Sequence, residues 1–156
     1  MRAFPNLARA LVGALLLTAT SLAAAGELNP SAIAILPPLD EIKWSSPLNG
    51  PNASYVIAGD PAKPGLYVQL TKWKAGNNFS RPHFHPNDRY ITVLRGTWWV
   101  GTGTKFDPAS TVPMKAGSVV THFGKQIHYD GAKDEDAILL IVGEGPATLT
   151  RVEEEK

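Results

Sequence analysis

Apolar and polar residues alternate with a period of two along much of the chain after residue 53. In the run 66–74, Leu66, Val68 and Leu70 alternate with polar or amphipathic residues, and this period places the two sets on opposite faces of a strand. Runs of this kind, separated by turn residues, predict strands at 54–58, 66–74, 90–95, 97–102, 112–115, 118–123, 127–129, 137–142 and 147–152. About nine short strands at close spacing favour an antiparallel sandwich or barrel over alternating strands and helices.

The composition agrees with a single all-β domain. A chain of 156 residues has room for one domain, and 44% hydrophobic with 19% charged residues supports a packed core. The 14 glycines and 13 prolines favour frequent turns over long helices. The formal charge of +1, without a dense basic stripe, predicts no nucleic-acid partner. There is no cysteine, so the fold depends on burial and not on disulfides.

The first 25 residues have the pattern of an export signal. Arg2 and Arg9 precede the apolar run 10–19, and small residues follow at 21–25. The alternative is a membrane anchor, but the run is shorter than the roughly 20 residues that a spanning helix needs. We therefore expect cleavage after Ala25 or Ala23 and export to the periplasm or the extracellular space. The mature form is expected to have no membrane contact.

The rest of the chain divides into three parts. Residues 26–53 contain several prolines among scattered apolar residues, which predicts an arm, with a short helix or one strand, that packs on the barrel and covers an edge or reaches a second subunit. A homodimer is therefore one expected arrangement. Residues 54–152 form the predicted barrel, and 153–156 form a disordered, charged tail.

Three of the four histidines form a pattern typical of a metal site. His83 and His85 flank Phe84, and side chains at i and i+2 of a strand point to the same face. His128 lies in a distant run. Neutral imidazoles bind divalent metals near pH 7, so these three residues are predicted to hold one divalent ion, with iron or zinc expected first although imidazole itself does not choose between them. The alternative is a metal-free barrel with hydrogen-bonded histidines.

Two segments resemble the motifs of the cupin family. Gly76, His83-x-His85 and Gly96 are similar to the first motif, and Gly117 with His128 is similar to the second. The segments 59–61 and 93–103 further resemble the cupin part of ChrR-type anti-sigma regulators. The resemblance implies a small single-domain cupin: an antiparallel β-barrel of the jelly-roll type, with a metal site at its centre on the three histidines.

The departures from the motifs change the expected site. Arg89 or Tyr90 stands where the first motif has glutamate, Phe123-Gly124-Lys125 replaces Pro-x-Gly, and Ala132 replaces asparagine. The resemblance then implies a three-histidine site without a carboxylate ligand, as in some cupin dioxygenases. Three neutral ligands leave the charge of the ion uncompensated and leave positions open for water, oxygen or an anionic substrate.

Three further residues are candidates for lining a substrate cavity. Arg89 is expected to face solvent; if it points inward, it marks a carboxylate or phosphate substrate, because a guanidinium beside a cation needs an anion between them. His122 is a candidate fourth ligand or proton carrier, with a rim or hydrogen-bonding role favoured. Trp98 and Trp99 point to opposite faces, so one lines the barrel, and core packing is favoured over substrate contact.

These features predict an exported metal-binding cupin. One hypothesis is a small metalloenzyme, resembling an oxygenase, that acts on a small organic acid. The other is a non-catalytic barrel that binds or senses a small ligand, and fold alone does not choose between them. No carboxylate base is apparent from the motifs, which disfavours base-dependent isomerisation and leaves redox chemistry open.

Overall fold

The computed structural model, which describes residues 26–45 and 50–153, has a strand in each predicted run, although the run 147–152 is a strand only at 150–151. The strands are β1 (Asn52–Ala58), β2 (Gly65–Trp73), β3 (Asn78–Phe79), β4 (His83–Phe84), β5 (Arg89–Arg95), β6 (Thr97–Thr102), β7 (Val112–Lys115), β8 (Val119–His122), β9 (His128–Ala132), β10 (Ala137–Gly145) and β11 (Thr150–Arg151). Two 3-10 turns, η1 (Leu39–Glu41) and η2 (Pro108–Ser110), are the only helical elements in these ranges. The alternation did not predict β3 and β4 as separate strands, because two residues are too few to show a period.

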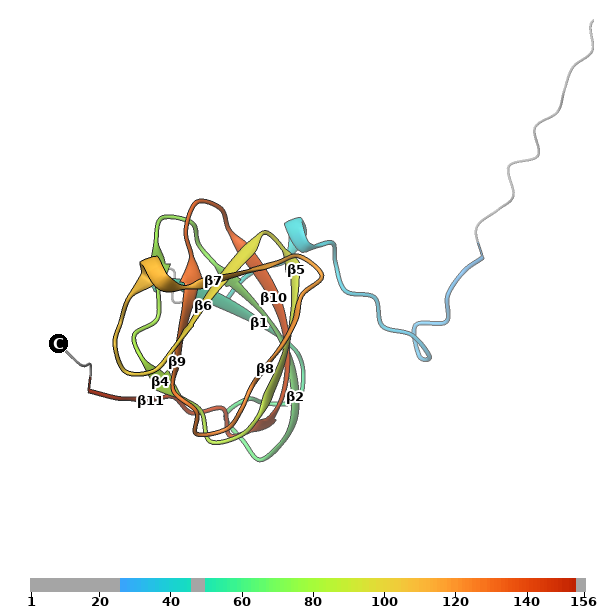
Figure 1. Ribbon diagram of the computed structural model, residues 1–156. Helices are drawn as coiled ribbons and strands as arrows, with labels where there is room; N and C mark the ends of the chain where they lie inside the picture. Colours follow the sequence, from blue (N-terminus) through green and yellow to red (C-terminus); the bar gives the residue numbers. More distant parts are fainter. Residues whose placement is uncertain (1–25, 46–49, 154–156) are drawn as a thin grey trace, which may run out of the picture. The chain divides into compact units, whose positions relative to one another are not determined.

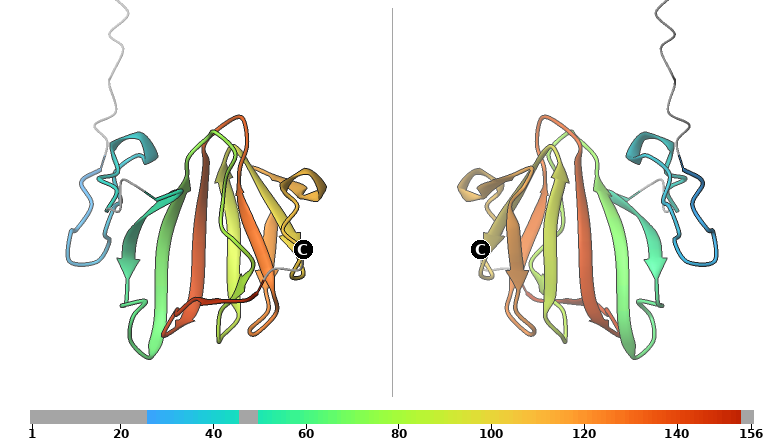
Figure 2. Two further views of the ribbon diagram at one scale, coloured as in Figure 1. Left: turned by 90° about the vertical axis from the view of Figure 1, so that its left-hand side faces the viewer. Right: turned by 90° about the vertical axis from the view of Figure 1, so that its right-hand side faces the viewer.

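Two antiparallel sheets face each other and enclose the interior of the molecule (Figures 1 and 2). One sheet has the order β1-β2-β10-β5-β8, and the other has the order β11-β4-β9-β6-β7 with β3 also paired to β9. The long strands β2 and β10 run side by side over their full lengths (Figure 2). The antiparallel β-barrel predicted from the strand pattern is therefore confirmed.

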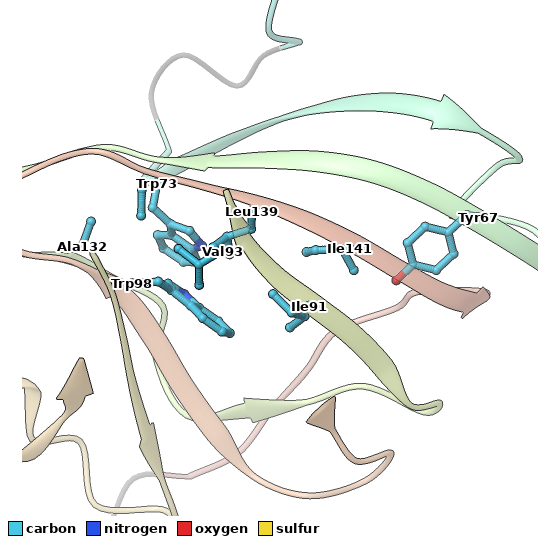
Figure 3. Packing of buried hydrophobic residues seen from close by; sticks show 9 residues of the cluster. Tyr67, Trp73, Ile91, Val93, Trp98, Ala132, Leu139 and Ile141 are labelled. Carbon is cyan, nitrogen blue, oxygen red and sulfur yellow. The ribbon is translucent and has the colours of Figure 1, made fainter. Parts of the chain in front are cut away.

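The hydrophobic core lies between the sheets and is concentrated toward one end of the barrel. Figure 3 shows Trp73, Trp98, Val93 and Leu139 gathered there, while Tyr67 lies at the other end with its hydroxyl turned into the barrel. Trp98 is fully buried, and burial of a side chain this large stabilises the fold by roughly 2–3 kcal/mol. Of the two neighbouring tryptophans, Trp98 is the one inside, as core packing predicts.

The next strand residue, Trp99, lies on the outer face. Lys133 stands 3.7 Å from the centre of its ring, a cation–π contact that partly covers an otherwise exposed aromatic surface. The alternation predicted for this strand is therefore confirmed, with the two rings on opposite sides of the sheet.

Residues 37–45 belong to the same unit as the barrel. Ile42 is buried, Ser45 forms a β-bridge with Ser54 at the start of β1, and Asp40 pairs with Arg95 at the end of β5. This part of the predicted arm is thus anchored by apolar burial, a backbone bridge and an ion pair.

Residues 26–36 form a separate unit. It contains a turn in which the Asn29 side chain accepts a hydrogen bond from the Ser31 amide at 2.9 Å. Within the described ranges no helix is long and apolar enough to span a membrane. The predicted signal peptide at 1–25 and the tail residues 154–156 lie outside the described residues.

Candidate metal centre

Strand pairing brings the three predicted histidines together inside the barrel. His83 of β4 is directly opposite His128 of β9, and His85 follows β4 on the same side, as the His-x-His spacing requires. All three are buried, and one ring nitrogen from each lies within 4.8 Å of the others. The ring centres of His83 and His128 are 4.5 Å apart. This group has the residue types and the spacing of a metal-binding site.

Backbone carbonyls orient all three imidazole rings. The Nδ1 atoms of His83 and His85 lie 2.8 Å from the carbonyl oxygens of Arg81 and Thr148, and Nδ1 of His128 lies 3.0 Å from that of Gln126. A carbonyl oxygen only accepts, so each Nδ1 carries the proton and each Nε2 carries the lone pair. Metal-binding histidines are usually oriented by a hydrogen bond of this kind from the other ring nitrogen.

The electrostatic environment keeps these rings neutral. Burial, helped by the charge of Arg89, lowers the pKa of His85 to about 3. Burial also lowers the pKa of His128 to about 4, although the carboxylate of Asp130 opposes the shift, and it lowers the pKa of His83. Neutral imidazoles are the form that binds a metal. The buried Nε2 of His85 has no hydrogen-bond partner, so this donor set fits a divalent ion.

Arg89 is buried next to the histidines, so the expectation that it faces solvent is wrong. Only 9% of its surface is exposed, and its Nη2 lies 3.3 Å from Nδ1 of His122 and 3.4 Å from Nε2 of His128. Strand register explains the orientation, because Arg89 alternates with the exposed Tyr90 and pairs with Gly143 of β10 and His122 of β8. General burial tendencies favour a solvent-facing arginine, and register overrides them here.

Gly143 makes room for this arrangement. It also pairs with Tyr67 of β2, and a Cβ atom at position 143 would lie only 2.8 Å from the Tyr67 hydroxyl. One row across four strands therefore holds Tyr67, Gly143, Arg89 and His122 on the inner face. Burial lowers the pKa of Arg89, yet a guanidinium remains protonated at neutral pH, so the row contains a buried cation.

His122 is buried next to His128, so the expectation that it lies at the rim of the barrel is wrong. Its expected hydrogen-bonding role is observed, because its Nδ1 contacts Arg89. Its ring centre lies 3.9 Å from that of His128 and 5.2 Å from that of Trp98. Burial lowers its pKa to about 2, with the neighbouring His128 and Arg89 contributing. Because Arg89 can only donate to Nδ1, the proton of His122 is on Nε2.

A buried carboxylate, Asp130, lies near the histidines and was not identified from the sequence. The Ser80 hydroxyl donates to its Oδ1 at 2.6 Å, and the Asp130 amide donates to the Ser80 oxygen at 3.0 Å. Asp130 follows His128 by two residues on β9, so the two share a face of the strand. The alternation His128-x-Asp130 was the available signal, but the cupin motifs do not include this position.

Comparison with solved structures identifies the fold. The molecule is similar to a cupin-like protein from Thermotoga maritima, with a TM-score of 0.54 and 16% identity over 72% of this chain and 85% of that chain. It is also similar to the polyketide cyclase RemF from Streptomyces resistomycificus, with a TM-score of 0.60 and 14% identity over 80% and 89%. The chain has the cupin fold.

The cupin barrel also resembles a regulator. Its similarity to the complex of Rhodobacter sphaeroides SigE with the anti-sigma ChrR has a TM-score of 0.52, with 15% identity over 69% of this chain and 51% of that chain. The predicted likeness to ChrR is thus confirmed for the fold. No family model and no curated protein matches the chain.

A cavity of about 200 Å³ reaches the histidines inside the cupin barrel. It is lined by Asn52, Ser54, Gln69, Thr71, Trp73, Ser80, His83, His85, Arg89, Ile91, Trp98, Asp130, Leu139, Ile141 and Leu149. A more open pocket of about 470 Å³ shares Gln69, His85, Arg89 and Leu149 with it, so the shared residues connect the cavity to its mouth. Two of the predicted substrate-lining residues, Arg89 and Trp98, line this cavity, whereas His122 lines another pocket beside His128.

Unpartnered polar atoms are concentrated around this site. Across residues 26–45 and 50–153, the buried side-chain atoms without a hydrogen-bond partner are Tyr67 Oη, His85 Nε2, Arg89 Nε, Trp98 Nε1 and His122 Nε2. Buried polar groups nearly always have a partner, because leaving one unpaired costs about 1–3 kcal/mol. Three of these residues, His85, Arg89 and Trp98, line the cavity, so the cavity has unmet hydrogen-bonding capacity of the kind expected in a binding site.

Proposed function

We propose that this protein is an exported metal-binding cupin that holds one divalent ion on His83, His85 and His128 and acts on a small organic acid. The observation that carries the proposal is the convergence of three neutral imidazoles whose Nδ1 atoms are all fixed by backbone carbonyls. Iron and zinc are the first candidates, because both accept imidazole ligands. The bound ion would supply a Lewis acid or a redox centre.

The buried Arg89 supports an anionic substrate. Arg89 adds a buried cation beside the proposed metal site, since its Nη2 lies 3.4 Å from Nε2 of His128. A guanidinium and a divalent ion this close together would repel each other strongly in a poorly solvated interior. Asp130 offsets one charge. An anion between the guanidinium and the ion would offset part of the remaining positive charge, and a carboxylate matches the fork of donors on a guanidinium. Arg89 would thus bind and orient the acid while the barrel excludes bulk water.

Two measurements test this function. Elemental analysis of protein purified without chelators should find one equivalent of a divalent metal, and oxygen uptake or product formation with small carboxylates should then show turnover. The matched variant Arg89→Gln should retain metal and lose acid binding, because it removes the charge and keeps a hydrogen-bonding side chain. Absence of metal in the folded protein, after supply of iron and of zinc, would contradict the proposal.

A non-catalytic role in binding or sensing a small ligand is the second candidate. The similarity to the complex of SigE with the anti-sigma ChrR favours it, since an anti-sigma protein acts by binding. Metal-loaded protein that is stabilised by an acid in thermal unfolding, yet neither consumes oxygen nor changes the acid, would support the binding role over catalysis.

A further inference from the structure

We infer that the acid bound by this site carries hydroxyl groups on its carbon chain. This inference rests on the proposed function and narrows its substrate class. The evidence is a polar wall of the cavity, formed by the side chains of Asn52, Ser54, Gln69, Thr71, Ser80 and Asp130. Thr71 and Asp130 are buried and the other four are half-buried, and polar groups in such positions are unfavourable unless they are hydrogen-bonded.

Strand β2 supplies the centre of the polar wall. Its inner face carries Tyr67, Gln69, Thr71 and Trp73 in alternation, so two polar residues lie between two aromatic residues of the core. A strand that only closed a hydrophobic core would be apolar at all of these positions. The two polar positions add an amide and a hydroxyl to the cavity that His83 and His85 also line.

Strand β1 extends the wall by pairing. Ser54 is directly opposite Thr71, so both hydroxyls line the cavity side by side. Gln69 donates from Nε2 to the Thr71 hydroxyl oxygen at 3.3 Å. That bond uses the oxygen of Thr71 as acceptor and leaves its proton available to a ligand.

On the other sheet, Asp130 and Ser80 provide the complementary acceptors. Ser80 donates to one carboxylate oxygen of Asp130, and an ionised carboxylate has acceptor sites for about four hydrogen bonds. A ligand hydroxyl in this cavity would find a donor in Thr71 and an acceptor in Asp130, which both line it. An unsubstituted carbon chain would use neither the remaining proton of Thr71 nor the remaining acceptor sites of Asp130, and a site built to bond a hydroxyl disfavours an analogue without one.

The dimensions and the remaining lining agree with a short hydroxy acid. The cavity of about 200 Å³ is below the roughly 300–1,000 Å³ typical of sites for larger ligands. Ile91, Leu139 and Ile141 form an apolar patch in the same lining. The site therefore offers Arg89 for the carboxylate, polar groups for hydroxyls and an apolar surface for the carbon chain.

Calorimetric titration of the metal-loaded protein with matched acids tests this inference. Malate and succinate form one pair and glycerate and propionate another, since the members of each pair have the same charge and differ in hydroxyl groups. The hydroxy acid should bind at least about tenfold more tightly in both pairs, the value of about one well-placed hydrogen bond. Equal affinity within both pairs would overturn the inference and leave the proposed function standing.

Two variants locate the preference on the polar wall. Thr71→Val should weaken malate binding about tenfold and change succinate binding less than twofold, and Gln69→Leu should act in the same direction. Thr92→Val is the matched control: Thr92 lies on β5 between the inward Ile91 and Val93 and faces outward, so both affinities should be unchanged. Equal losses for malate and succinate in both wall variants would overturn the inference. Failure of every acid to bind the metal-loaded wild type would overturn the proposed function with it.

Discussion

The two ends of the inner barrel surface use the same strands for opposite purposes. At one end, Leu139 of β10 pairs with Val93 of β5, and both are packed with Trp73 and Trp98. Four residues further along β10, Gly143 pairs with Arg89 and with Tyr67, in the row that also holds His122. Alternation sends both sets inward. Alternation therefore separates the two faces of each strand, and the residues in each row decide whether the part of the interior that they line is core or site.

The two ends also differ in how many of their buried polar atoms have hydrogen-bond partners within the chain. The packed end is largely apolar and gains its stability chiefly from burial, although Trp98 Nε1 there has no hydrogen-bond partner. The histidine end holds unpartnered donors and a buried cation, which burial disfavours. The packed end therefore stabilises the barrel, and this stability allows the histidine end to retain unpartnered polar atoms that can bind a metal ion or a ligand.

The largest effect on stability is expected at the packed end. Leu139→Ala should lower the free energy of unfolding by about 3 kcal/mol, because it removes buried methyl groups and leaves a cavity. Val119→Ala, at a side chain that is 73% exposed, should change it by less than about 0.5 kcal/mol. Urea unfolding of the metal-free variants measures both. A loss below 1 kcal/mol for Leu139→Ala would show that the packed end is not the main source of stability.

The next largest effect is expected on metal affinity, and it should distinguish the proposed ligand His128 from the neighbouring His122. His128→Ala should weaken metal binding by at least about 100-fold, since it removes one of three ligands. His122→Ala should change the affinity less than about threefold, because its Nδ1 accepts from Arg89. Competition with a chromogenic chelator measures both. Equal losses would mean that His122 is also a ligand.

Arg89→Gln should move metal and acid affinity in opposite directions. Metal should bind about tenfold more tightly, because the variant removes a like charge and a donor that contacts Nε2 of His128. Acid binding should weaken by a similar factor or more. Calorimetry with metal alone and then with malate measures the two. A parallel loss of both affinities would show that Arg89 only supports the fold.

A smaller, graded effect is expected from pH on the metal-free protein. The pKa of His85 is lowered to about 3 and that of His122 to about 2, chiefly by burial, so the unfolded chain binds protons near pH 6.5 that the folded chain does not. Full stability should be present above about pH 6.5. Each such histidine should remove about 1.4 kcal/mol per pH unit as the pH falls below that value.

The variant His122→Gln provides the control for the pH dependence. It keeps an acceptor for Arg89 and removes one titrating ring, so the slope of unfolding free energy against pH between 6 and 4.5 should decrease by about one histidine's share. Chemical unfolding at a series of pH values measures the slope. An unchanged slope would show that His122 is not the buried neutral ring described above.

The sequence predicts which residues form the site better than it predicts how they are arranged in space. The His83-x-His85 spacing places two rings on one side of a strand, but only the pairing of β4 with β9 shows that His128 lies opposite His83. Which face of β5 and β9 points inward depends on sheet closure, a long-range property. The sequence pattern alone therefore predicts a solvent-facing Arg89 and does not reveal that Asp130 is buried near the histidines. Export and the metal itself stay predictions.

The groups that orient the three imidazoles all belong to the main chain. A side-chain substitution does not remove a peptide carbonyl, so the three carbonyls that orient the imidazole rings are kept in such variants. Substitutions around the cluster can therefore change which ligand the cavity binds while the rings keep their orientation. The loops that carry Arg81, Gln126 and Thr148 should therefore tolerate exchange of side chains and resist insertion or deletion. Such a scaffold can change its chemical preference through evolution without rebuilding its centre.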